Sequence, residues 1–203
     1  MLRTNQRIYL VWKRLCDIGL SFLSLLLFSP LLLICFLITL LDSKGHPIFR
    51  QERLGKNEKV FRILKFRSMK RGSVQVDPYS ISKEDLLKMT TKWGAFMRRS
   101  SIDELPQLLN ILVGQMSFIG PRPSQCKSIE PALVDLREKA CPSPYLVKPG
   151  LSGYAQLKLL SSPSVEEKAR LDSEYVKRMS LGLDFCLFWK SLFIGFLPNK
   201  GHR

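Results

Sequence analysis

The longest apolar stretch of the chain lies near its N-terminus. Ile18 to Leu41 comprises 24 residues without a charged side chain. As one α-helix it would be roughly 36 Å long, which is enough to cross a bilayer. Its length and the lack of a small-x-small cleavage site argue against a secretory signal peptide. The pattern therefore predicts a membrane segment.

Two features favour a re-entrant hairpin over a spanning helix. Ser29-Pro30 stands in the middle of the run, where proline lacks an N–H and crowds the carbonyl of Leu26. We expect a kink there, with the Ser29 hydroxyl bonding a freed carbonyl. Both flanks are basic: Arg3, Arg7, Lys13 and Arg14 before the run, and Lys44, Arg50, Arg53 and Lys56 after it. Positive flanks prefer the cytoplasm, so both ends are expected there. A spanning helix with a proline kink is the alternative.

Shorter patterned segments follow the apolar run. Residues 47–50 and 59–66 are expected to be extended, with a turn at 56–58 between them. A polar loop is expected at 73–82, followed by a short helix at 82–88. These segments begin the part of the chain that follows the membrane segment.

A second helix is expected from Asp103 to Val113. Its leucines, at positions 105, 108, 109 and 112, follow the spacing of one helical face. Pro106 is tolerated only in the first turn, which places the helix start near Asp103. Gly114 is a suitable C-terminal stop.

The C-terminal part continues the helical pattern. Val165 to Met179 is expected to be an exposed, charged helix, and Leu181 to Leu197 an apolar, aromatic helix at the membrane interface. An ordinary buried helix is the alternative for the latter. Together the elements predict an α+β, mainly helical fold. We divide the chain into an N-terminal membrane segment at 1–45, a cytoplasmic catalytic domain at 46–180 and a C-terminal interfacial segment at 181–203.

Charge and cysteine usage narrow the choice of partners. The net charge is +15, with 32 Lys plus Arg against 17 Asp plus Glu, which implies an anionic partner. Nucleic acid, an anionic membrane face and phosphorylated ligands all qualify, although no nucleic-acid motif is recognisable. Five scattered cysteines and two distant histidines argue against a disulfide framework and a zinc site. A reducing, cytosol-facing location is expected.

Two neighbouring carboxylates, Asp103 and Glu104, stand among cations. They would also fit a capping box with Ser101, a purely structural role. The cations are Arg98 and Arg99 upstream, Arg122 between two prolines downstream, and Lys65 and Arg67, which alternate along an extended stretch and are expected on one face. This combination suits phosphoryl chemistry, because a carboxylate can hold Mg²⁺ or attack phosphorus while cations neutralise oxygen charge.

Several segments stand in an order that resembles a known family. They are RQERLGK (50–56), KFRSM (65–69), RRSSIDELPQLLNIL (98–112), MSFIGPRP (116–123), KPGLSGYAQL (148–157) and, before them, KRLCDIGLSFLSLLLFSP (13–30). Together they resemble the bacterial sugar transferases of the monotopic phosphoglycosyl transferase superfamily. The resemblance covers about Lys13 to Tyr175. Each motif is modest alone, but the set in this order is specific, and the chain is similar to the compact form of the family.

The resemblance implies a reaction and a location. Such enzymes transfer a phospho-sugar from a UDP-sugar to polyprenol (undecaprenyl) phosphate and release UMP, as the first membrane step of glycoconjugate or polysaccharide assembly. The expected location is the bacterial inner membrane, with the catalytic domain on the cytoplasmic face. Ser29-Pro30 matches the family's helix break.

The resemblance also implies residue roles. Asp103 would be the nucleophile that forms an aspartyl phospho-sugar intermediate, with Glu104 assisting beside it. Both carboxylates would hold Mg²⁺, the expected cofactor. Lys65, Arg98 and Arg122 would bind phosphate oxygens. The partners implied are the UDP-sugar, the polyprenol phosphate and the lipid bilayer, with no nucleic acid.

One residue departs from the family pattern, and two functions stand as alternatives to the sugar transferase. Gln115 stands where the family commonly has an acidic residue, which makes the local support of the Arg122 loop less certain. The rivals are a membrane-attached basic binding or scaffold protein and a membrane phosphohydrolase that uses water in place of the lipid acceptor.

Overall fold

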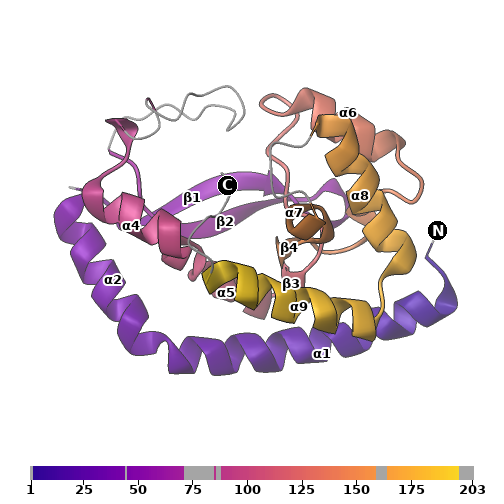
Figure 1. Cartoon of the computed structure of the whole chain (residues 1–203), viewed down its shortest axis with the longest axis horizontal. Helices are drawn as coiled ribbons and strands as arrows, with labels where there is room; N and C mark the ends of the chain where they lie inside the picture. The colour runs from indigo at the N-terminus through magenta and orange to yellow at the C-terminus, as the bar shows by residue number, and fades with distance from the viewer. Residues whose placement is uncertain (1, 44, 71–84, 86–87, 159–163, 197–203) are drawn as a thin grey trace.

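A long bent helical pair runs along one side of the molecule, and the other helices and two small sheets lie on the other (Figure 1). This computed structural model describes residues 2–43, 45–70, 85, 88–158 and 164–196. The architecture confirms the predicted α+β, mainly helical fold. The loop predicted at 73–82 lies outside the described residues, and of the helix predicted at 82–88 only residues 85 and 88 are described.

The bent pair consists of α1 (Thr4–Leu27) and α2 (Ser29–Asp42), which meet at an angle of 64°. Pro30 lies in the first turn of α2, where its missing N–H leaves no helical bond unmade. The Ser29 hydroxyl donates to the Leu26 carbonyl at 2.8 Å, so the predicted kink and its hydroxyl contact are confirmed. Among the described residues, no single helix has the length and apolar composition to cross a membrane. The two bent helices meet that criterion only when taken together.

Helix α1 is apolar outside and polar inside. Its outer surface exposes large apolar side chains: Ile8, Val11, Trp12, Leu15, Phe22 and Leu26 are among them. Its inner face buries Gln6, Asp17 and Ser21. Asp17 Oδ1 accepts hydrogen bonds from the Ser117 hydroxyl and from the Phe118 amide, each at 3.1 Å. This polarity is the reverse of that of a helix on a protein exposed to water.

The first sheet pairs β1 (Ile48–Leu54) with β2 (Val60–Phe66) in antiparallel register, with Ile48 opposite Phe66. The connecting 3-10 turn η1 (Lys56–Glu58) has positive φ at Asn57 and Glu58. The two predicted strands and their turn are therefore confirmed, although β1 continues beyond residue 50. Asn110 extends the pairing, because its side chain accepts from the Leu64 amide and donates to the Arg62 carbonyl.

The remaining elements surround this hairpin (Figure 1). They are α4 (Lys92–Ser100), η2 (Ile102–Glu104), α5 (Gln107–Leu112), β3 (Ser117–Ile119), α6 (Pro131–Lys139), η3 (Pro144–Leu146), β4 (Gly150–Ser152), α7 (Tyr154–Lys158), α8 (Val165–Arg178) and α9 (Leu181–Phe196). Strands β3 and β4 pair in parallel. All five cysteines are free, as expected from their spacing.

Buried side chains hold β2 from both sides. Phe66 packs with Cys35 of α2 and Met97 of α4. On the other side, Phe61 and Ile63 pack against α5. The end of β2 is therefore fixed relative to both α4 and α5, the helices on either side of η2.

Helices α8 and α9 complete the fold. Helix α8 is not simply exposed as predicted, because one face is buried and Asp172 forms an ion pair with the buried Arg137 of α6. Helix α9 lies beside α1 (Figure 1). The α9 carboxylate of Asp184 accepts bonds from Tyr9 and Lys13 of α1 and from Tyr175 of α8. Most of the large apolar side chains described in α9, among residues 181–193, remain exposed, including Phe185, Trp189 and Phe193, so α9 is not an ordinary buried helix.

Candidate active site

Asp103 and Glu104 lie in the 3-10 turn η2 between α4 and α5. Helix α4 begins at a Thr91 cap and ends at Ser101, whose φ of 58° is in the left-handed region. The predicted helix from Asp103 to Val113 is therefore only partly correct. The α-helix starts at Gln107, because Leu105 and Pro106 separate it from η2.

The capping-box interpretation of Ser101 and Glu104 is wrong. Ser101 ends α4, and its side chain makes no capping hydrogen bond to η2. The Glu104 carboxylate points instead toward two cations. Its Oε1 atom accepts from Lys65 Nζ at 2.9 Å and from Arg122 Nη2 at 3.2 Å.

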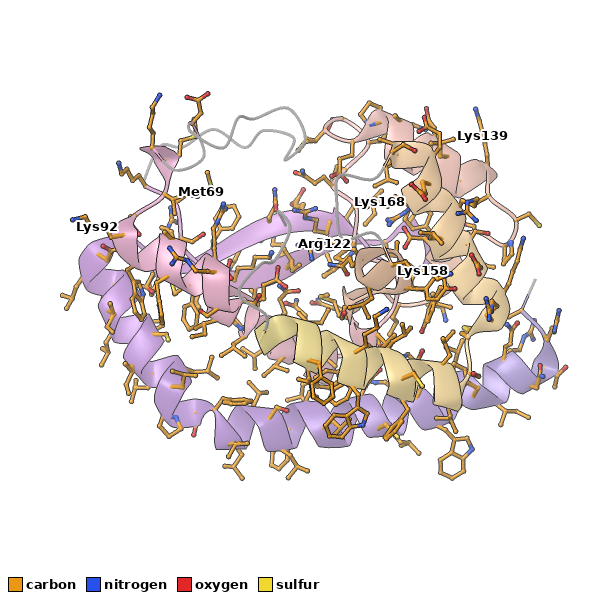
Figure 2. All side chains as sticks on the ribbon, viewed as in Figure 1. Met69, Lys92, Arg122, Lys139, Lys158 and Lys168 are labelled. Carbon is orange, nitrogen blue, oxygen red and sulfur yellow. The ribbon has the colours of Figure 1, made fainter. Side chains whose placement is uncertain are left out.

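The three groups of this cluster come from distant parts of the chain. Lys65 lies near the end of β2, and Arg122 lies in the Gly-Pro-Arg-Pro loop after β3, near the middle of the view in Figure 2. The side chains are largely buried, with 18% of Lys65, 14% of Glu104 and 30% of Arg122 exposed. The fold therefore brings Lys65 and Arg122 together on one carboxylate oxygen.

Arg98 approaches from α4. Its Nε atom donates to the Ser68 hydroxyl at 2.9 Å, just beyond the end of β2. Gly94 permits this approach, because a Cβ added there would lie 2.0 Å from the Ser68 carbonyl oxygen. Arg67 does not join the cluster with Lys65: its Nε donates to the His46 carbonyl. Of the two cations expected on one face, only Lys65 reaches Glu104.

Asp103 differs from Glu104 in its contacts. It is 8% exposed, and no described residue makes a hydrogen bond or ion pair with its carboxylate. Burial, followed by the negative charge of Glu104, raises the pKa of Asp103 from 3.8 to about 6. The charges of Lys65, Arg98 and Arg122 act in the opposite direction. The two carboxylates are thus held differently: Glu104 is fixed by cations, and Asp103 is surrounded by them without a direct partner.

Burial and charge also affect two nearby cations. Burial lowers the pKa of Lys65, while Glu104 opposes that change. Burial and the charge of Arg122 lower the pKa of Arg53 to about 10. The side chain of Arg53 donates to Gln51 and to the Pro123 carbonyl, and so supports the loop that carries Arg122. The sequence marks Arg53 as a basic flank of the apolar run and as part of the RQERLGK motif, without a role in the site. Because side chains alternate along a strand, Gln51 and Arg53 are expected on one face of β1, and this pattern could have indicated that they contact each other.

The carboxylates limit which metal the site could hold. No group of three His, Cys, Asp or Glu suited to a metal occurs in the described part of the chain. Mg²⁺ is commonly held by one or two carboxylates together with substrate phosphates and water. The unpartnered Asp103, with Glu104 beside it, suits that mode of binding. A site made only of protein ligands would need more groups.

Gln115 lies in the turn after α5. Its Oε1 atom accepts from Asn110 Nδ2 at 2.7 Å, and Asn110 in turn bonds the backbone of β2. A carboxylate would accept the same hydrogen bond. The amide of Gln115 therefore fulfils the acceptor role locally, and the contacts of Arg122 with Glu104 are formed with glutamine in place.

Comparisons with known proteins identify the family. Residues 8–197 match the family described as bacterial sugar transferase. The chain is 37% identical over 206 residues to a UDP-glucose:undecaprenyl-phosphate glucose-1-phosphate transferase of Klebsiella pneumoniae, covering 96% of this chain and 42% of that protein. It is 35% identical over 201 residues to the exopolysaccharide production protein PSS of Rhizobium leguminosarum bv. phaseoli, covering 95% and 98%.

The name of a third relative specifies a different sugar. The chain is 37% identical over 191 residues to a UDP-N-acetylgalactosamine-undecaprenyl-phosphate N-acetylgalactosaminephosphotransferase of Aeromonas hydrophila, covering 91% of this chain and 44% of that protein. The chain thus spans less than half the length of the Klebsiella and Aeromonas proteins and nearly all of the Rhizobium protein. Because the family match covers most of its residues, the chain belongs to the bacterial sugar transferase family.

Proposed function

We propose that this chain transfers a phospho-sugar from a UDP-sugar to polyprenol (undecaprenyl) phosphate and releases UMP. The observation that carries the proposal is the buried, unpartnered Asp103 carboxylate among Lys65, Arg98 and Arg122. A nucleophile must be free to approach phosphorus, whereas cations must be fixed where oxygen charge develops. The activities named for the Klebsiella and Aeromonas relatives support the same reaction class.

The first step forms a covalent intermediate. A carboxylate oxygen of Asp103 attacks the phosphorus that bears the sugar. The bond from this phosphorus to the bridging oxygen breaks, and its electron pair leaves with UMP. Lys65, Arg98 and Arg122 neutralise charge on the phosphate oxygens. Glu104 holds Lys65 and Arg122 in position.

The second step regenerates the enzyme. An oxygen of polyprenol phosphate attacks the same phosphorus, the bond to Asp103 breaks, and the carboxylate is restored. The two substrates then use one site in turn, so ping-pong kinetics are expected. Asp103 and Glu104 would hold Mg²⁺, which would supply further neutralisation of phosphate charge.

The exposed apolar surface supports the proposal of a membrane position for the enzyme. The outer face of α1, together with α2 and α9, presents large apolar side chains to the surroundings. A contiguous surface of this kind is expected to contact lipid or another apolar partner. We place it in the cytoplasmic leaflet of the bacterial inner membrane, with α1 and α2 re-entrant. This position brings the enzyme to the depth of a lipid phosphate.

The decisive experiment traps the intermediate. Full-length protein is incubated with a radiolabelled UDP-sugar and no lipid acceptor, and label on the protein is measured after denaturation. The wild type is expected to retain label, which added polyprenol phosphate removes. Asp103→Asn should retain none, with transfer lowered by at least 10³-fold, while the protein still inserts. Near-normal transfer by Asp103→Asn would exclude Asp103 as the nucleophile. A panel of UDP-sugars then identifies the donor.

The rival functions give different results in the same assay. Without a lipid acceptor, a phosphohydrolase would release UMP over many turnovers, whereas the proposed transferase would release at most one UMP per enzyme molecule. A binding or scaffold protein would release none. EDTA should stop transfer and added Mg²⁺ should restore it. Full activity in EDTA would remove Mg²⁺ from the mechanism.

A further inference from the structure

A hollow of about 80 Å³ lies between α1 and the elements packed on it. The lining residues come from α1, η1, β3, the loop before β4 and α8, and four of them are basic: Lys13, Arg14, Lys56 and Lys148. None of the residues of the candidate active site lines it. One water molecule needs a cavity volume of roughly 10–15 Å³. The hollow, at about 80 Å³, can therefore hold a small oxyanion.

The positive charge around this hollow is only partly balanced. Lys13 forms an ion pair with Asp184. Among the described residues, Asp17 is the only carboxylate that lines the hollow, and its Oδ1 atom already accepts bonds from the Ser117 hydroxyl and from the Phe118 amide. Arg14 donates to two neutral acceptors, the carbonyls at the C-terminal end of α5. Three cations therefore share one carboxylate.

The two remaining lysines make no direct contact with an acceptor. Among the described residues, neither Lys56 nor Lys148 has a hydrogen bond or an ion pair through its ammonium group. The charged ends of Arg14 and Lys148 both lie beside Gly114. A Cβ added to this glycine would lie 3.0 Å from Arg14 Nη2 and 3.2 Å from Lys148 Nζ. Burial has the largest effect on the pKa of Lys148 and lowers it, and the positive charges of Arg14 and Lys56 lower it further, against the charge of Asp17. A bound anion would relieve this repulsion.

We infer that this hollow binds a phosphate group, at a site separate from Asp103 and its cations. Arg14 uses two of its five N–H donors, and each lysine can offer three, so donors for several phosphate oxygens are present. The phosphate is either a free ion or part of a lipid headgroup. The apolar outer face of α1 is one helix diameter away, roughly 10 Å, which is a suitable depth for a headgroup if α1 lies in the interface.

The test measures binding and does not depend on transfer activity, so it can fail independently of the proposed reaction. Full-length protein in a non-ionic detergent is titrated with inorganic phosphate, and separately with dihexanoyl-phosphatidylglycerol below its micelle concentration. Binding is followed by ³¹P NMR. Lys148→Met and Lys56→Met are compared with Lys139→Met, which removes an equal charge from α6, at the far side of the molecule from α1 (Figure 2).

The inference predicts at least tenfold weaker binding in Lys148→Met and Lys56→Met, and unchanged binding in Lys139→Met. Lys148→Arg should keep most of the affinity. A loss with inorganic phosphate identifies a free-ion site, and a loss confined to the lipid probe identifies a headgroup site. Equal affinity of all three methionine variants for both probes would overturn the inference. The exposed position of Lys56 keeps the test valid if Lys148→Met folds poorly.

Discussion

Replacing the proposed nucleophile should stabilise the protein. Asp103 is buried beside Glu104, and its folded-state pKa of about 6 lies above the ordinary value of 3.8. The folded protein therefore binds a proton at Asp103 more readily than the unfolded chain does. The ionised carboxylate destabilises the fold, and this cost appears as pH rises from about 4 through 6. Asparagine has nearly the same shape and carries no charge at any pH.

The magnitude follows from the pKa difference. About two pKa units correspond to about 3 kcal/mol, at 1.36 kcal/mol per unit. We expect Asp103→Asn to raise the free energy of unfolding at pH 7 by about 1–3 kcal/mol, since the pKa of about 6 already includes the opposing attraction of Lys65, Arg98 and Arg122. For a chain of this size the melting temperature should rise by about 2–10 °C.

Thermal unfolding in one detergent, at pH 7 and at pH 4.5, measures this effect. The difference between Asp103→Asn and the wild type should be large at pH 7 and should shrink at pH 4.5, where the wild-type carboxyl is mostly protonated in the folded state. An equal or lower melting temperature for Asp103→Asn at pH 7 would refute the reasoning. It would mean that the surrounding cations, and not burial, dominate at Asp103.

Three further outcomes are expected. Glu104→Gln should lower the free energy of unfolding by about 2–3 kcal/mol, because it leaves Lys65 buried without its counter-charge. Chemical denaturation measures this change, and an unchanged denaturation midpoint would contradict the ion-pair geometry. The value of kcat/KM should fall up to tenfold per unit below pH about 6 as Asp103 protonates, and a flat profile down to pH 5 would argue against it. In a cysteine-free background, Asn5→Cys and Gly45→Cys should both react with an impermeant thiol reagent from the cytosolic side; labelling from opposite sides would establish a spanning helix.

Local chemistry was sufficient to predict some of these features. The kink at Ser29-Pro30 follows from the geometry of proline and the reach of a serine hydroxyl, both within one helical turn. The β1–β2 hairpin follows from extended segments around a polar turn. In each case the residues that decide the structure are close together in sequence.

Features that depend on long-range packing were not predictable in the same way. The helix start at Gln107 was not predicted, because residues 102–104 form the separate 3-10 turn η2, which follows a Ser101 at positive φ, an unusual conformation for serine. Lys65 and Arg122 were expected near the two carboxylates, but their direct ion pairs with Glu104 were not predicted, since no local rule links positions so far apart. The burial of Asp17 was not foreseen, because its partners lie about 100 residues later.

The contacts of the buried face of α1 with later parts of the chain affect the order of folding during synthesis. At roughly 5–20 residues per second, the ribosome adds Ser117 about 5–20 s after Asp17. Asp184, the partner of Tyr9 and Lys13, is added later still. During that interval the nascent helix carries a carboxylate without its native partners, next to the most apolar segment of the chain. The helix that is synthesised first is therefore among the last to complete its native contacts.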